Sequence, residues 1–175
     1  MRAWVLAFGS LLWSAQAVAD DPNTIISVIS GHWVSVISTD EAGNRICVGA
    51  TPPTLGFRAS PQGLEIRITD DAWSMSADVH GDVTFKIGSE TKTFPMSALS
   101  GTTLAGEVQA TDLADLLDAM DKAPFAKILV GKAKPITVSL NGSTRALNDF
   151  RTCSTVKGYG DLGGQTVAGG NPFQN

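Results

Sequence analysis

The chain has 175 residues, of which 13 are basic and 17 acidic, and its formal net charge is −4 at pH 7. This length suits a single domain with one hydrophobic core. Nucleic acids and anionic membranes are bound by clustered basic faces, and the lysines and arginines of this acidic chain are scattered, so neither is expected as a partner.

Residues 1–19 are typical of a cleavable secretory signal. Arg2 precedes an apolar run at 3–13, and Ala17-Val18-Ala19 supplies the small residues of a cleavage site. We therefore predict cleavage after Ala19 and a periplasmic or secreted protein. The run is shorter than the roughly 20 residues of a membrane-spanning helix, and Asp20 replaces the cysteine of a lipoprotein. Neither a membrane span nor a lipid anchor is expected.

Polar and apolar residues then alternate with the period of two that indicates half-buried β-strands. The alternation is clearest at 64–69, 83–88 and 136–140. Further strands are predicted at 32–38, 45–51, 54–59, 72–77, 91–94, 104–109 and 127–130. Short strands at this spacing predict an antiparallel β-sandwich or barrel.

Two short helices are predicted to interrupt the strands. The first takes Thr111 as its N-cap, ends near Pro124, and has an apolar stripe at i, i+3, i+4 and i+7 formed by Leu113, Leu116, Leu117 and Met120. The second takes Ser143 as its N-cap and buries Ala146, Leu147 and Phe150. Residues 20–157 are therefore expected to form one mainly β domain.

The segment 158–175 is rich in glycine and poor in apolar residues, so we predict a flexible, disordered tail. Gly158, Gly160 and Gly163 match the letters of a dinucleotide-binding fingerprint. That fingerprint needs a strand before it, a helix after it and an acidic residue about 20 positions further on, and this chain ends at Asn175. No cofactor is expected.

Cys47 and Cys153 are the two cysteines of the chain, and both follow the predicted signal. Paired thiols persist in the oxidising compartments that exported proteins reach. We therefore predict a Cys47–Cys153 disulfide that joins an early strand to the last helix. The alternative, free or catalytic thiols, has no Cys-x-x-Cys spacing to support it.

Histidine offers little to catalysis or metal binding in this chain. Asp78, His80 and Asp82 alternate as metal ligands can, but His80-Gly81 is better explained as a two-residue hairpin loop, and no metal is expected. His32 is the other histidine. The sequence contains no Gly-x-Ser-x-Gly, His-Glu-x-x-His or Ser-x-x-Lys motif, so no catalytic residue is assigned.

Two further patterns have simple structural interpretations. The acidic residues of the first helix recur every three positions, as expected of a solvated face opposite a leucine stripe, at Asp112, Asp115, Asp118 and Asp121. Trp33 and Trp73 lie on predicted strands, where large aromatic side chains usually fill the core.

The strand pattern, the helices and several short motifs together resemble the invasion-associated locus B family of small exported bacterial proteins. The motifs are Gly31-His32-Trp33-Val34, Cys47-Val48, the helix 113–119, and Ser139-Leu140-Asn141-Gly142-Ser143 leading to Ala146-Leu147 and Phe150. The similarity covers roughly residues 30–153. It implies a periplasmic or envelope β-sandwich without enzymatic activity.

The predicted function is non-catalytic binding of a protein or envelope component by sheet edges, loops or the C-terminal tail. One alternative is a periplasmic inhibitor of a protease or lysozyme that presents Pro52-Pro53 or Ser60-Pro61-Gln62-Gly63 as its loop. A hydrolase with a dispersed active site is the third possibility.

Overall fold

The computed structural model describes residues 24–40 and 42–163, which form ten strands and two helices. The helices are α1 (Ala110–Met120) and α2 (Ser143–Lys157). The strands are β1 (Ile25–Ser30), β2 (Trp33–Thr39), β3 (Arg45–Thr51), β4 (Leu55–Ser60), β5 (Gly63–Thr69), β6 (His80–Ile87), β7 (Glu90–Ala98), β8 (Thr103–Val108), β9 (Phe125–Val130) and β10 (Ile136–Ser139).

All ten strands belong to one antiparallel sheet, in the order β1-β2-β3-β4-β5-β8-β7-β6-β9-β10. The predicted mainly β, antiparallel fold with two helices is therefore confirmed. β8 and β7 pair only at Ser97 with Ala105 and at Ala98 with Leu104. We call this short stretch of pairing the joint between β8 and β7. A side chain at Gly106 would approach the carbonyl oxygen of Pro95 to 2.5 Å, so the two strands come close beside this joint without further pairing.

The two ends of the sheet approach each other, because the β1–β2 turn packs on the turn between β10 and α2. The Trp33 indole Nε1 donates to the carbonyl oxygen of Ser139 at 2.9 Å. Gly142 has φ +89°, and a Cβ atom there would overlap the carbonyl oxygen of Ser30. Only glycine satisfies both conditions, since L-residues rarely adopt this φ.

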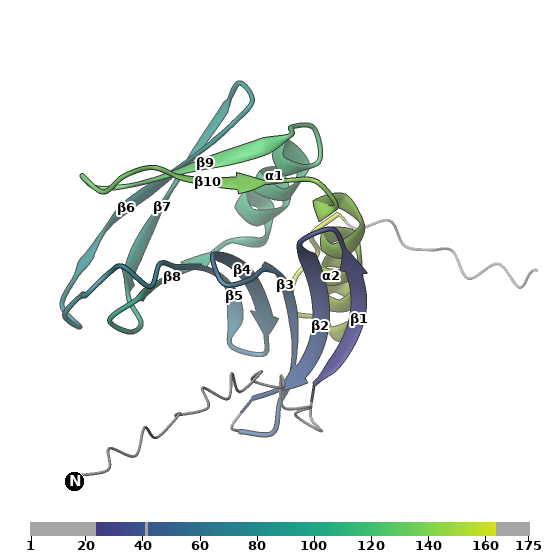
Figure 1. Cartoon of the computed structure of the whole chain (residues 1–175). Helices are drawn as coiled ribbons and strands as arrows, with labels where there is room; N and C mark the ends of the chain where they lie inside the picture. The colour runs from purple at the N-terminus through teal and green to yellow at the C-terminus, as the bar shows by residue number, and fades with distance from the viewer. Residues whose placement is uncertain (1–23, 41, 164–175) are drawn as a thin grey trace, which may run out of the picture.

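Both helices lie on the inner side of the curled sheet. Figure 1 shows α1 between the two halves of the sheet and α2 against one side of β1, β2 and β3. The core is aromatic at its centre: the rings of Trp33 and Phe57 are stacked with centroids 6.5 Å apart, and Phe150 of α2 lies 6.3 Å from Phe57. Trp33 is fully buried, as predicted, and Trp73 packs partly buried against the same core.

The predicted disulfide is present. Cys47 of β3 and Cys153 of α2 are bonded, with their Cα atoms 6.0 Å apart and 106 positions apart in sequence. Gly49, two residues further along β3, faces the same helix: a Cβ there would lie 3.0 Å from the Cβ of Phe150. The bond and the close approach together fix α2 on the sheet.

Two predictions of strands and loops were wrong, and one strand was missed. Residues 72–77 form no strand: they lie in the loop between β5 and β6, where the Asp70 carboxylate accepts a hydrogen bond from the backbone N–H of Ala72 and starts a turn. His80 and Gly81 are not a hairpin loop but the first residues of β6, and His80 pairs with Ser97. β1 was not predicted, because a register shift near Ser27 breaks its alternation.

Both predicted N-caps were also wrong. Gln109 precedes α1, and Thr111 lies inside the helix. Gly142, in a left-handed conformation, precedes α2, while the buried Ser143 hydroxyl donates to the carbonyl oxygen of Leu140. Neither N-cap residue makes a side-chain hydrogen bond to its helix.

The first part of the predicted tail is ordered, contrary to the prediction. Residues 158–163 pack on the domain: the Tyr159 hydroxyl donates to the carbonyl oxygen of Arg45, and the Ser154 hydroxyl donates to that of Gly160. Leu162 is fully buried. The predicted signal, at 1–19, and the rest of the predicted tail, at 164–175, lie outside the described residues.

Candidate interaction surface

One face of β1–β3 is apolar although neither α1 nor α2 covers it. Strand pairing aligns Ile26 of β1 with Val36 of β2 and Val48 of β3 in one row, and Ile29 with Val34 and Ala50 in the next. The intervening residues, such as Trp33 and Cys47, point toward α2, so these rows face the other way. We call this surface the outer apolar face: Ile26, Ile29, Val34, Val36, Ile46, Val48 and Ala50.

The composition of the outer apolar face departs from that of ordinary antiparallel sheets, which carry polar residues on a solvated side. Ile26 and Ile29 are 57% and 63% exposed, and the valines of β2 and β3 are partly exposed. Three strands that lie about 4.8 Å apart and are about 23 Å long form a sheet face with an area on the order of 300 Å². An exposed apolar patch of this size on a single chain often marks a binding site.

Charged residues of β4, β5 and β8 form a rim along one border of the outer apolar face, beyond β3. The row of Ile26, Val36 and Val48 continues across the sheet to Arg58, Glu65 and Glu107. Glu65 Oε2 accepts a hydrogen bond from Arg67 Nε at 2.8 Å and lies 3.9 Å from Arg58 Nη1. The rim therefore carries charges of both signs, and its Glu65 is paired with two arginines.

The rim continues into the β2–β3 loop. Asp40 Oδ2 lies 3.6 Å from Arg58 Nη2, and Asp40 Oδ1 accepts a hydrogen bond from the backbone N–H of Asn44 at 2.8 Å. That N–H, more than the arginine, holds the pKa of Asp40 below its usual value. The carboxylate thus stays ionised at neutral pH and shapes the loop beside the face.

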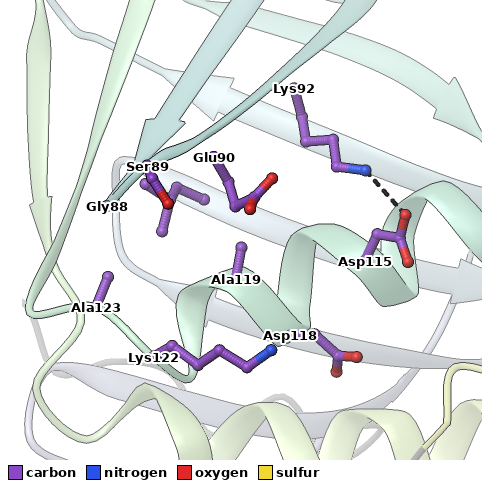
Figure 2. A pocket seen from close by; sticks show the side chains of 10 residues that line it. Gly88, Ser89, Glu90, Lys92, Asp115, Asp118, Ala119, Lys122 and Ala123 are labelled. Atoms are coloured by element: carbon purple, nitrogen blue, oxygen red, sulfur yellow. Dashed lines mark hydrogen bonds and ion pairs between the residues drawn. The ribbon is translucent and has the colours of Figure 1, made fainter.

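A hollow of about 380 Å³ lies between α1 and the turn of β6 and β7. Figure 2 shows Glu90, Lys92, Asp115, Asp118 and Lys122 around it, with a hydrogen bond of 2.8 Å from Lys92 Nζ to Asp115 Oδ2. This bond raises the pKa of Lys92. The lining charges alternate in sign and lie at the surface, which gives the hollow no preferred ligand.

A larger hollow, of about 590 Å³, lies on the outer side of the joint between β8 and β7. Its lining includes Glu65, His80, Asp82 and Glu107. Within the described residues no group of three or more histidine, cysteine or acidic side chains is placed to hold a metal ion. The hollow therefore has carboxylates without a geometry for a metal.

The two histidines lie in different parts of the molecule. His32 is exposed in the β1–β2 turn. His80 is exposed at the start of β6, where its Nδ1 donates to the carbonyl oxygen of Asp78 at 2.9 Å. The Asp78 carboxylate accepts from the Ser76 hydroxyl, which lowers the pKa of Asp78. The structure thus does not bring Asp78, His80 and Asp82 together as ligands.

The four aspartates of α1 are exposed, as predicted, but three of them also form ion pairs that the spacing did not indicate. Asp115 binds Lys92, whereas Asp118 Oδ1 lies 2.7 Å from Nη1 of Arg151 and Asp121 Oδ2 lies 3.5 Å from Nη2. The Arg151 side chain is only 3% exposed, and its Nη1 also donates to the carbonyl oxygen of Leu162 at 2.9 Å. This buried arginine joins both helices to the segment after α2.

The two loops that a protease or lysozyme inhibitor would present, at 52–53 and 60–63, lie at opposite ends of β4. Pro52 and Pro53 are exposed between β3 and β4, and Pro61 and Gln62 are exposed between β4 and β5. Both are tight connections within the sheet, and neither projects as an extended loop.

No family model, no curated protein and no solved structure matches this chain. The resemblance to the invasion-associated locus B family therefore stays a prediction. None of the helices among the described residues is long and apolar enough to cross a membrane.

The outer apolar face was not predicted from the sequence, although the residues of β1 and β2 indicate it. Residues 24–39 contain no Asp, Glu, Lys or Arg, and the segment 33–37 is apolar at four of its five positions, on both faces of the strand. A strand that is apolar on both faces needs two covering layers. The described chain supplies one of them, α2.

Proposed function

We propose that this protein is a non-catalytic exported interaction module, similar to the invasion-associated locus B family, that binds a protein of the cell envelope. The outer apolar face is the observation that carries the proposal, because apolar sheet surface without a covering layer is stabilised by a partner. The disulfide supports an oxidising compartment. The rigid attachment of α2 keeps the face preformed, which lowers the entropic cost of binding.

Export is the first part of the proposal that can be tested. When the chain is expressed in a Gram-negative host, we expect it in the periplasmic fraction with Asp20 as its N-terminal residue, because signal peptidase cleaves after small residues. N-terminal sequencing of the purified protein is the measurement. A cytoplasmic product that retains Met1 would refute export.

The contact surface is tested by photo-crosslinking in the envelope. A photoreactive phenylalanine analogue at Val48, at the centre of the face, is expected to yield adducts with an envelope protein. Adding Val36→Lys to the same chain is expected to reduce the yield at least about tenfold, since a charge in an apolar contact is desolvated without a partner.

Val156 supplies the matched control, because it is a valine 77% exposed on α2, away from the outer apolar face. The same analogue at position 156 should give no adduct, and Val156→Lys should leave the yield at position 48 unchanged. Equal adducts from 48 and 156, or none from 48, would show that the face does not bind an envelope protein.

A further inference from the structure

The segment that follows α1 separates basic residues from acidic ones. From Lys122 to Asn148 the chain contains four lysines and one arginine but no aspartate or glutamate. Because the whole chain has a formal net charge of −4 and this segment contributes +5, the remaining residues have a net charge of −9. The basic residues are scattered over the chain as a whole, which argued against an anionic membrane, but this segment is an exception.

Strand pairing brings a further lysine beside this segment. Lys86 of β6 lies directly opposite Lys127 of β9, and both side chains are exposed. The neighbouring strands continue the same row with Thr91 of β7 and Thr137 of β10. Neither lysine forms an ion pair with any residue that the structure describes. Like charges at directly opposed positions destabilise a sheet, and an anion bound between them would relieve the repulsion.

Three more exposed residues lie on the β9–β10 hairpin. Phe125 is 51% exposed and shares the outward side of β9 with Lys127, while the alternate residues of this strand are buried. Lys132 and Lys134 are exposed in the loop that joins the two strands. Figure 1 shows this loop projecting away from α2 and from β1–β3. We call these residues the basic hairpin surface: Lys86, Phe125, Lys127, Lys132 and Lys134.

We propose that the basic hairpin surface binds an anionic phospholipid membrane. Charge selects an anionic partner, since four lysines lie there. The outward residues of β9 favour a lipid surface among anionic partners, because Phe125 and Leu129 flank Lys127 on the same side of the strand. The lysines bind the phosphate groups of the lipids while the aromatic ring enters the boundary of the acyl chains. A soluble polyanion would use the lysines alone.

Other kinds of partner fit the basic hairpin surface less well. The cores of protein–protein interfaces are depleted in lysine, so a protein partner would not choose this part of the sheet. Small molecules bind in concave sites, and neither of the hollows described above is lined by a residue of this surface other than those of α1 and its neighbouring turn. The inference is independent of the outer apolar face, which lies on β1–β3.

The first experiment is co-sedimentation of the purified exported chain with vesicles at about 0.1 M NaCl, where the Debye length is about 10 Å. The protein is expected to bind vesicles of phosphatidylcholine that contain about 30% phosphatidylglycerol, and not vesicles of phosphatidylcholine alone. Lys127→Glu should lower the partition coefficient at least about tenfold, because each lysine near an anionic surface contributes about a fivefold factor and a glutamate is repelled.

Two observations separate this loss of binding from a loss of structure or of net charge. Lys127→Glu places opposite charges at 86 and 127, so its thermal unfolding temperature should be no lower than that of the unmodified chain. Lys157, the exposed last residue of α2, is the matched control. Lys157→Glu changes the net charge equally and should bind vesicles as the unmodified chain does.

The second experiment distinguishes a lipid surface from a soluble polyanion. Phe125→Ala is expected to lower vesicle binding at least about threefold, because the ring is the apolar group that enters the membrane. Heparin, a soluble polyanion, is the comparison: binding to heparin should be weaker than binding to the vesicles and should not change on Phe125→Ala.

Failure to bind the phosphatidylglycerol vesicles, or equal losses from Lys127→Glu and Lys157→Glu, would overturn the inference. Binding to heparin without binding to vesicles would also overturn it and assign the surface to a soluble polyanion. The adducts at Val48 report on a different surface, so the membrane contact and the envelope partner can fail separately. Vesicle binding without those adducts would support the membrane contact and refute the envelope partner.

Discussion

Replacing both cysteines by alanine is expected to lower the free energy of unfolding by about 4 to 5 kcal/mol, the largest single effect in this protein. The bond between Cys47 and Cys153 spans 106 positions. In the chain-entropy model, closing a loop of this length removes about 4 to 5 kcal/mol of conformational freedom from the unfolded chain. Urea denaturation of Cys47→Ala/Cys153→Ala beside the oxidised protein measures the difference.

The reduced form of the unmodified chain is the control for this prediction. It keeps both cysteine side chains and so separates the covalent bond from the packing of Cys47, which is only 1% exposed. We expect reduced protein and the double variant to agree within about 1 kcal/mol, the scale of removing one small buried side-chain atom. A loss under about 1 kcal/mol on reduction would contradict the loop-closure account.

Removing the counterions of Arg151 is expected to cost about 3 kcal/mol of folding free energy. Asp118→Asn/Asp121→Asn keeps the shape of both side chains but leaves a guanidinium that is 3% exposed without a negative charge beside it. Breaking a buried ion pair costs roughly 3 to 5 kcal/mol, and the lower end applies because the Asp118 and Asp121 side chains are themselves 56% and 24% exposed. Urea denaturation gives the value.

The same helix supplies a matched control. Asp112→Asn/Asp115→Asn removes two charges from α1, but these residues are exposed, and Asp115 pairs with a surface lysine. We expect a loss below about 1 kcal/mol, as is usual for surface pairs and first-turn charges. Equal losses from the two double variants would show that Arg151 does not depend on its pair of aspartates.

Local periodicity predicted the strands well where alternation was regular. At 64–69 the strand β5 and its inward residues Leu64, Ile66 and Ile68 agree with the prediction. The same method failed at 72–77, where a turn begun by Asp70 replaces the expected strand. It missed β1, where the register shift puts Ile26 and Ile29 on one face despite their odd spacing. Strand pairing, not local alternation, decides such cases.

The pattern of Asp112, Asp115, Asp118 and Asp121 could not reveal which carboxylates pair with a buried arginine. All four recur at the same spacing on α1, and the difference between them comes from Arg151, which lies on another helix. The packed segment 158–163 was equally hidden, because its glycines suggest freedom while Tyr159 and Leu162 anchor it to distant residues. Such contacts join residues that no local pattern relates.

Patterns in the amino-acid sequence were sufficient to predict a mainly β, antiparallel domain with two helices and a disulfide between its two cysteines. Alternation, helical spacing and cysteine count are local or compositional properties, so they can be recognised without a fold. The packing of α2 on one face of β1–β3, which leaves Val36 and Val48 on the other face uncovered by it, became visible in the folded chain alone. Alternation shows which residues share a face, but whether a second layer packs on that face depends on where the rest of the chain goes.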